Sequence, residues 1–200
     1  MQPAAVACLA FLVGSIPTGV IITRLVRGSD IRQVGSGNIG ASNVARAAGI
    51  KIGALVAVLD IVKGAAPVVF GRGLGLDHRA LAIVGLAAVL GHDFSIFLRF
   101  RGGKGVATTL GVLLALTPVP ALIAVAVWVV VMTLSRYSSL ASLAALAVLP
   151  ALVALAHQPA EYVVLAVVLA LLGIAKHWEN IIRLRHGTER RFGTRGATGG

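Results

Sequence analysis

The chain has 200 residues, of which 58% are hydrophobic and 12% are charged. Soluble domains are about half apolar and about a quarter charged, so this composition excludes an ordinary water-soluble surface and predicts an integral membrane protein. The formal net charge is +11, but few aromatic residues accompany the basic ones, which argues against nucleic-acid binding. The single cysteine, Cys8, supports neither a disulfide nor a metal site.

Long apolar stretches predict membrane-spanning helices, each of which needs about 20 mostly apolar residues. They cover residues 3–26, 51–70, 79–98, 105–134, 138–156 and 160–176. The fourth is too long for one pass, because its helix would reach about 45 Å against a hydrocarbon core of about 30 Å. Thr117-Pro118-Val119-Pro120 interrupts it, and proline ends or kinks helices. We therefore expect a hairpin there, and an all-α protein of seven transmembrane helices.

Basic residues indicate the orientation. The segments 24–50, 93–104, 135–138 and 176–200 carry nearly all the lysine and arginine, and the intervening loops hold only Arg72 and Arg79. The positive-inside rule then predicts an N-terminus outside and a cytoplasmic C-terminus. No basic region precedes the first apolar segment, which we expect to be a retained helix. Residues 1–192 are predicted to form a single polytopic domain, and residues 193–200 a disordered tail.

Several polar residues fall inside or beside the apolar segments. Pro17 is expected to kink the first helix. Asp60 and Lys63 are spaced i and i+3, so they can pair on one helical face. A structural ion pair is the preferred interpretation, and a functional one stays open because ions in membranes are often functional. A structural role is also expected for His92 and Asp93, which end the third predicted helix.

The first polar motif, VGSGNIGASN at residues 34–43, contains a G-x-G-x-x-G pattern, with Asp60 20 residues beyond its last glycine. A dinucleotide site needs a strand before this pattern and a helix after it. Here a membrane helix and a basic linker precede it, and Asp60 lies in a membrane helix, so that interpretation is excluded. Glycines can still bring backbone amides close to an anion. Ser36, Asn38, Ser42, Asn43 and Arg46 add further donors. A capped glycine-rich turn without a ligand is the alternative.

The second motif is Phe100–Thr109, with the sequence FRGGKGVATT. It is not a Walker motif, because Leu98 stands where the first glycine is required and Gly105 follows Lys104 in place of Ser or Thr. A lysine framed by glycines at the start of a helix suits a phosphate group. The alternative is a basic membrane anchor, although an anchor would not need glycines.

The third motif runs from Lys176 to Arg191. His177 and Asn180, spaced i and i+3, share one helical face, and histidine can transfer protons near neutral pH. The alternative is a basic interfacial tail. Three serines also begin the sixth predicted helix, and we expect them to cap it, with ligand contact as the second possibility. They are Ser138, Ser139 and Ser142.

Four segments together resemble the bacterial acyl-phosphate:glycerol-3-phosphate acyltransferase family, from about residue 14 to residue 192. They are GSIPTG, GSGNIGASNVAR, FRGGKGVAT and HWENIIRLRHGTE. The resemblance implies a seven-helix enzyme of the bacterial inner membrane with its active site facing the cytoplasm. It would transfer a fatty acyl group from acyl phosphate to the 1-hydroxyl of glycerol 3-phosphate. The products would be lysophosphatidic acid and inorganic phosphate, in an early step of phospholipid synthesis.

The resemblance also assigns roles to single residues. The catalytic set would be Ser36, Arg46, Lys104, His177 and Asn180. The substrate-binding set would be Gly35, Gly37, Asn38, Gly40, Asn43, Gly103, Gly105 and Ser142. Glu189 would be structural and tie the tail in place. Ser42 stands where threonine is more usual in the family, and it keeps the hydroxyl.

The implied partners are acyl phosphate, glycerol 3-phosphate, membrane lipid and a soluble enzyme that makes acyl phosphate, with no nucleic acid, metal or cofactor. Two other classes of protein are weighed against this one. A transporter of phosphorylated metabolites would place its site near the midplane between inverted repeats, whereas the polar motifs here gather on one face. A scaffold for anionic lipid would need neither glycine turns nor a histidine–asparagine pair.

Overall fold

The computed structural model describes residues 2–193, and those residues form helices and loops without a strand. The α-helices are α1 (Pro3–Ser15), α2 (Thr18–Arg27), α3 (Ala41–Ala48), α4 (Ile50–Gly73), α5 (His78–Asp93), α6 (Val106–Leu116), α7 (Pro118–Ser135), α8 (Ser138–Leu155), α9 (Ala160–Lys176) and α10 (Trp178–Arg185). Two 3₁₀ turns, η1 (Ile31–Gln33) and η2 (Ile96–Leu98), lie in the loops. Residues 194–200 of the predicted tail lie outside the described part, and the domain boundary at residue 192 stays a prediction.

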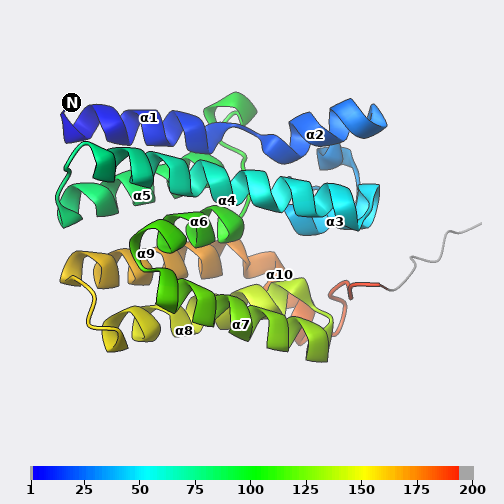
Figure 1. Ribbon diagram of the computed structural model, residues 1–200. Coiled ribbons are helices and arrows are strands. Elements are labelled where there is room, and N and C mark those ends of the chain that lie inside the picture. The colour runs from blue at the N-terminus through cyan, green and yellow to red at the C-terminus, as the bar shows by residue number, and fades with distance from the viewer. Residues whose placement is uncertain (1, 194–200) are drawn as a thin grey trace, which may run out of the picture.

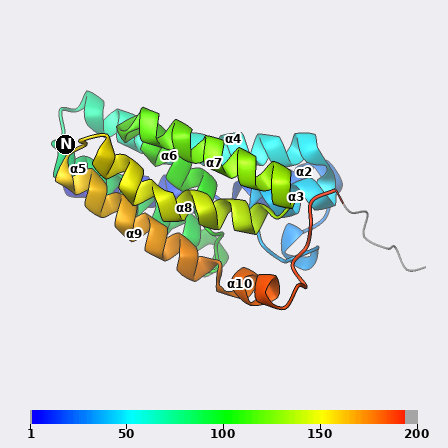
Figure 2. The same ribbon diagram turned by 90° about the horizontal axis from the view of Figure 1, so that it is seen from below.

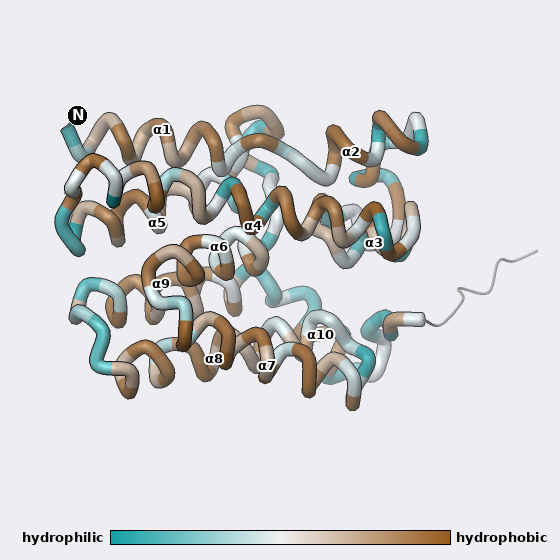
Figure 3. The backbone as a smooth tube through the Cα atoms, viewed as in Figure 1, coloured by the Kyte–Doolittle hydropathy of each residue, from teal (hydrophilic) through white to brown (hydrophobic). Residues whose placement is uncertain are grey.

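The helices lie side by side, with α1, α2, α4 and α5 on one side of the molecule and α7, α8 and α9 on the other (Figure 1). The short helix α6 lies between these groups and contacts both α4 and α7. Seen from below, α7, α8 and α9 run roughly parallel (Figure 2). Hydrophobic residues cover the helices along their length, and hydrophilic ones gather at the ends and breaks (Figure 3). Leu134 and Leu155 are 82% and 76% exposed, as expected of side chains that face lipid.

The all-helical membrane fold is confirmed, and so is the break in the fourth apolar stretch, because α6 ends before Thr117 and α7 begins at Pro118. Among the described residues, five helical segments are long and apolar enough to cross a membrane, and α9 with α10 adds a sixth if this pair, bent by 58°, is one span. Helix α6 has 11 residues, or about 16 Å, which is well short of a span. The count of seven and the orientation therefore stay predictions.

Glycines allow the helices to pack closely. Gly14 of α1 lies against the backbone of Ala88 in α5, and Gly64 of α4 lies against the backbone of Thr108 in α6, so a Cβ at either glycine would collide with a carbonyl group. Small residues of this kind are typical of helix contacts in membranes, where packing replaces the hydrophobic effect as the driving force.

The predicted kink at Pro17 is confirmed as a break between α1 and α2. The break frees the carbonyl of Ile16, which accepts a hydrogen bond from Lys63 Nζ at 2.8 Å. Lys63 also forms the expected ion pair with Asp60 at 2.8 Å, and Thr18 donates to the same carboxylate at 2.5 Å. Asp60 and Lys63 are 2% and 5% exposed. The ion pair therefore fixes the α1–α2 break against the middle of α4.

Replacing Lys63 with methionine should destabilise the protein, because it leaves the Asp60 carboxylate buried without its cation. Breaking one side of a buried pair typically costs about 3–5 kcal/mol. The thermal unfolding midpoint of purified protein in detergent measures this loss. Lys51→Met, at an exposed lysine of the same helix, is the matched control and should unfold at the wild-type temperature. An unchanged midpoint for Lys63→Met would contradict the structural role.

Candidate active site

A cavity of about 800 Å³ connects the three polar motifs with an apolar space between the helices. We call it the substrate cavity. Its polar lining comes from Ser36, Asn38, Ser42, Asn43, Arg46, Asp60, His92, Lys104, Thr109, Ser138, Ser139, Ser142, His177, Asn180, Arg183, Glu189 and Arg190. Its apolar lining includes Ile61, Leu110, Val125, Trp128, Met132, Leu146 and Leu149. One cavity thus combines groups suited to anions with a surface suited to a hydrocarbon chain.

Asn43, which is 2% exposed, shapes the first motif from inside. Its Oδ1 accepts from the Ser36 amide at 3.0 Å, and its Nδ2 donates to the carbonyls of Val34 and Asn38 at 2.9 Å each. Gly35 has a φ of +66°, and a Cβ there would collide with Asn43 Oδ1. The loop is therefore wound around the Asn43 amide, which also explains the need for glycine at position 35.

More backbone amides of this loop form hydrogen bonds within the motif than the sequence predicts. The amides of Ser36, Gly37 and Gly40 donate to Asn43 Oδ1, the Val34 carbonyl and Asn38 Oδ1 respectively. The prediction that glycines in this loop offer free amides to a phosphate is therefore wrong for Gly37 and Gly40. The first turn of α3 lines the cavity instead through Ala41 and Ser42, and the first N–H groups of a helix have no partner within it. Arg46 adds a positive charge one turn further along.

The second motif is hydrogen-bonded to the C-terminal end of α5. The amides of Gly102 and Gly103 donate to the carbonyls of Asp93 and His92 at 3.2 and 3.0 Å. Gly103 lies so close to the His92 ring that a Cβ would collide with it, and Gly103 does not line the substrate cavity. The Gly103 amide is thus bonded to His92 and does not face the substrate cavity. Its role is to let the loop pack on His92, in keeping with the structural role expected of His92 and Asp93.

Gly105 turns the chain into α6. Its φ is +68°, and a Cβ there would lie 2.8 Å from Asp93 Oδ1. Only glycine fits this position without strain. Gly105 N-caps α6, so Lys104 is held beside the start of that helix, where the N-terminal amides favour an anion. Lys104 and Gly105 both line the substrate cavity.

The third motif lies where α9 bends into α10. His177 Nδ1 lies 2.7 Å from the Gly173 carbonyl. Since a carbonyl only accepts, Nδ1 carries the hydrogen, and Nε2 is the nitrogen left for another partner. Asn180 accepts a hydrogen bond from Lys104 Nζ through its Oδ1. Residues 76 positions apart in the sequence are thereby brought together.

Glu189 ties α8, α10 and the tail together, as its expected structural role requires. It accepts from Ser139 Oγ and Asn180 Nδ2 at 2.7 Å each, and from Arg183 Nε at 2.8 Å. Burial alone would raise the pKa of the Glu189 carboxyl, but these hydrogen bonds outweigh it and lower the pKa. Glu189 therefore stays ionised and fixes the orientation of the Asn180 amide.

The expectation that serines cap α8 is wrong. The N-cap is Tyr137, and no side chain bonds to the free amides there. Ser139 donates to Glu189 instead. Ser142 donates to the Ser138 carbonyl at 2.8 Å and accepts from Trp128 Nε1 at 3.2 Å. Ser142 nevertheless lines the substrate cavity, so its expected substrate contact stays a prediction.

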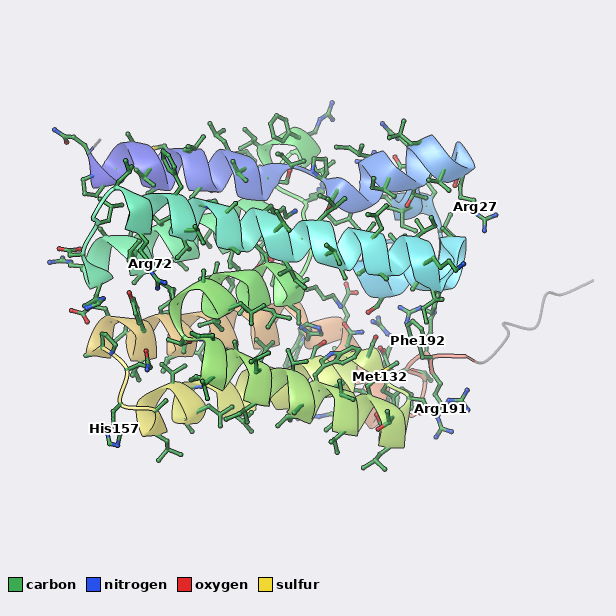
Figure 4. All side chains as sticks on the ribbon, viewed as in Figure 1. Arg27, Arg72, Met132, His157, Arg191 and Phe192 are labelled. Atoms are coloured by element: carbon green, nitrogen blue, oxygen red, sulfur yellow. The ribbon has the colours of Figure 1, made fainter. Side chains whose placement is uncertain are left out.

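The tail and α7 contribute lining residues that were not predicted from the sequence. Phe192 lines the cavity, and the Arg46 guanidinium lies 5.6 Å from the centre of its ring. Met132 of α7 lines it as well. Figure 4 shows Met132 and Phe192 towards one end of the molecule, with Arg72 and His157 towards the other. No spacing signal marks Met132, because α7 is apolar on all sides.

Comparison with known proteins agrees with this arrangement. Residues 4–187 match the family model of glycerol-3-phosphate acyltransferase. The chain is 52% identical to the glycerol-3-phosphate acyltransferase of Myxococcus xanthus (strain DK1622), over 94% of this chain and 98% of the relative. It is 46% identical to that of Rubrobacter xylanophilus, over 96% of each chain.

Two solved structures have the same fold. They are crystal structures of PlsY (YgiH), an integral membrane glycerol 3-phosphate acyltransferase, in the glycerol 3-phosphate and lysophosphatidic acid forms. Their TM-scores are 0.92 and 0.90, at 44% and 42% sequence identity, and each alignment covers 97% of both chains. The resemblance seen in the four motifs is thereby confirmed, and the chain belongs to the glycerol-3-phosphate acyltransferase family of integral membrane enzymes.

Proposed function

We propose that this protein transfers a fatty acyl group from acyl phosphate to the 1-hydroxyl of glycerol 3-phosphate, giving lysophosphatidic acid and inorganic phosphate. The observation that carries the proposal is the composition of the substrate cavity. It holds Lys104, His177 and Asn180 within one polar region and continues into an apolar space between helices. This combination fits a reaction between a phosphate ester and an acyl chain.

The polar region has to hold two anions that repel each other in water. Lys104, Arg46 and Arg183 supply positive charge from three separate segments. Cations fixed in a partly buried site offset this repulsion and stabilise the phosphate as it leaves. Acyl phosphate is already an activated mixed anhydride, so direct attack by the substrate hydroxyl needs no acyl-enzyme.

In the proposed step, the oxygen of the 1-hydroxyl forms a bond to the acyl carbonyl carbon. The bond from that carbon to the phosphate oxygen breaks, and the bonding pair leaves with inorganic phosphate. The hydroxyl proton goes either to Nε2 of His177 or to a phosphate oxygen of a substrate. The hydrogen bond from Nδ1 to Gly173 fixes the imidazole with Nε2 available for the first route.

The apolar region of the substrate cavity would hold the acyl chain. Gly53, Ala54 and Ala57 of α4 line one side of it, and Val125 and Val129 of α7 line the other. Small residues on α4 leave room for a chain, and an opening towards lipid would let lysophosphatidic acid leave sideways. We place the enzyme in the bacterial inner membrane with the site facing the cytoplasm, where a soluble enzyme supplies acyl phosphate.

The reaction can be tested with purified wild-type protein in detergent. Acyl phosphate and glycerol 3-phosphate should give lysophosphatidic acid without coenzyme A or added metal, as followed by phosphate release and by lipid chromatography. His177→Ala should lose most of the turnover, roughly a hundredfold, as typical of a lost acid–base group. Anion uptake into proteoliposomes without acyl transfer would favour a transporter, and a trapped acyl-enzyme would exclude direct attack.

The pH dependence of glycerol 3-phosphate binding should follow Lys104. Burial, together with the nearby charge of Arg183, lowers the pKa of Lys104 to about 8. The cation that attracts phosphate is thus present at pH 7 and largely lost by pH 9, whereas the phosphate is a dianion throughout, with its second pKa near 6. The KM for glycerol 3-phosphate should rise about fivefold or more from pH 7 to pH 9.

Lys104→Arg keeps its charge over this range, so its KM should change much less between pH 7 and pH 9. Lys104→Ala should show a high KM at both values. Initial rates at saturating acyl phosphate give each KM. A wild-type KM that is flat across the range would rule out Lys104 as the titrating group.

Glu189→Gln should lower turnover about tenfold or more, because hydrogen bonds to a charged group are worth about 1.5–3 kcal/mol each and the Asn180 amide loses its anchor. Glu179→Gln is the matched control on the preceding helix, since the Glu179 side chain is 84% exposed. It should keep wild-type kcat. Equal losses in the two variants would show that removal of any local negative charge is enough, and would refute the positioning role.

A further inference from the structure

Lys104 lies well below the end of the helix bundle. Helix α6 begins beside the middle of α4, where Thr108 meets Gly64, and Gly64 lies about 21 Å along α4 from Ile50. Lys104 precedes Thr108 by about one turn, which places it roughly 15 Å in from that end of α4. A water-soluble dianion therefore needs an aqueous path inward.

The chain that reaches this depth is irregular. Residues 99–105, between η2 and α6, form no helix. Backbone of this kind is tolerated at membrane depth only where protein buries it or where it lines a water-filled cavity. A second cavity, of about 1020 Å³, lies along this segment and is lined by Arg99, Phe100, Arg101, Gly102 and Lys104. We call it the vestibule.

The vestibule is rich in positive charge. Its basic lining residues are Arg32, Arg99, Arg101, Lys104, Lys176 and Arg183, and its acids are Asp30 and Glu179. Asp30 is already paired with Arg24 and Arg32 at 2.7 and 2.6 Å. The hydrogen bond from Arg32 holds the pKa of the Asp30 carboxyl well below its usual range. Arg183 is paired with Glu189 and Glu179 at 2.8 and 3.7 Å. Among the described residues, the vestibule cations without an ion pair are therefore Arg99, Arg101, Lys104 and Lys176.

Two of these cations are held by an unusual backbone. Arg99 and the following Phe100 have φ values of 54° and 62°. Consecutive left-handed residues other than glycine are uncommon and cost free energy, and such outliers gather at functional sites. Hydrogen bonds from the Phe100 amide to Ser95 and from the Arg101 amide to Leu98, at 2.8 and 3.1 Å, maintain the turn. The turn presents Arg99 and Arg101, both exposed, beside the vestibule.

The vestibule and the substrate cavity meet at a common wall. Ser36, Asn38, Lys104 and Arg183 line both. An anion that enters the vestibule therefore reaches Lys104 without crossing the apolar region between α4 and α7. The two cavities differ in character, because six basic residues line the vestibule beside a few apolar ones such as Ile39 and Phe97, whereas the substrate cavity continues into a largely apolar region.

We propose that the vestibule is the aqueous entrance for a soluble phosphate monoester, and that Arg99 and Arg101 collect this anion and pass it to Lys104. The proposal rests on the proposed function in naming glycerol 3-phosphate as that anion. A cavity lined by one sign of charge raises the local concentration and association rate of the opposite ion. Screening by salt weakens such attraction between exposed charges.

The test is the double variant Arg99→Gln/Arg101→Gln, assayed over a range of ionic strength. At low salt its KM for glycerol 3-phosphate should rise about fivefold with kcat unchanged, and the difference should shrink towards about 0.5 M salt as screening takes over. Arg101→Gln alone, which leaves the left-handed residues intact, should give about half of the effect on a logarithmic scale. Arg185→Gln, at an exposed cation of α10 that lines neither cavity, should match wild type.

Three outcomes would overturn the proposal. The first is a double variant whose KM and salt dependence equal those of wild type, and the second is a double variant that loses kcat at constant KM. The third is a KM that rises when phosphatidylglycerol is added to micelles of wild type but not to micelles of the double variant. The last would assign the vestibule to lipid head groups. Calorimetric binding of glycerol 3-phosphate alone separates the two proposals. Salt-dependent binding lost in the double variant, with no acyl transfer by wild type, would refute the function and retain the entrance.

Discussion

In hydrocarbon every backbone polar group needs a partner inside the protein, and this chain breaks its helices repeatedly. At these breaks, side chains from other segments donate hydrogen bonds to the backbone carbonyls that have lost their helical partners. Lys63 donates to the carbonyl of Ile16 at the α1–α2 break, and Ser95 donates to Ser15 at 2.5 Å beside it. Lys176 donates to the Asp93 carbonyl at 3.0 Å, where α5 ends. The breaks are therefore stable features of the fold, and the candidate site is built around them.

The same need to pair every buried polar group explains how the site is built. Asn43 winds one loop around its amide, and Glu189 joins three segments through its carboxylate. Each makes several hydrogen bonds from one buried or half-buried position, so few polar groups need to enter the bundle. Lys104 and Asn180 are held by this framework, which leaves the cavity-facing groups already oriented before a substrate arrives.

Much of this arrangement could be predicted from the sequence, because its signals are local. Proline marks both helix breaks that were expected, and glycines mark the loops whose backbone approaches its neighbours. Charge spacing identified the Asp60–Lys63 pair. Hydrogen-bond choice could not be predicted in the same way. The sequence does not indicate that Ser139 donates to Glu189 in preference to capping α8, or that the Gly103 amide donates to the His92 carbonyl. The acyl region was equally hidden, because a helix such as α7 is apolar on every side and its sequence does not separate lipid-facing from cavity-facing residues.

The common wall between the two cavities has a consequence for how the reaction rate depends on the supply of the two substrates. Under the proposed function, the acyl donor arrives from lipid, where abundance is a density per unit area of membrane. Glycerol 3-phosphate arrives from water, where abundance is a concentration per unit volume. The catalytic rate would then depend on two quantities that vary independently as a cell changes its size or its ratio of surface to cytoplasm. Lys104 lines both cavities. Under the proposed function, a supply set by membrane area and a supply set by aqueous volume would therefore enter the same rate law at this residue.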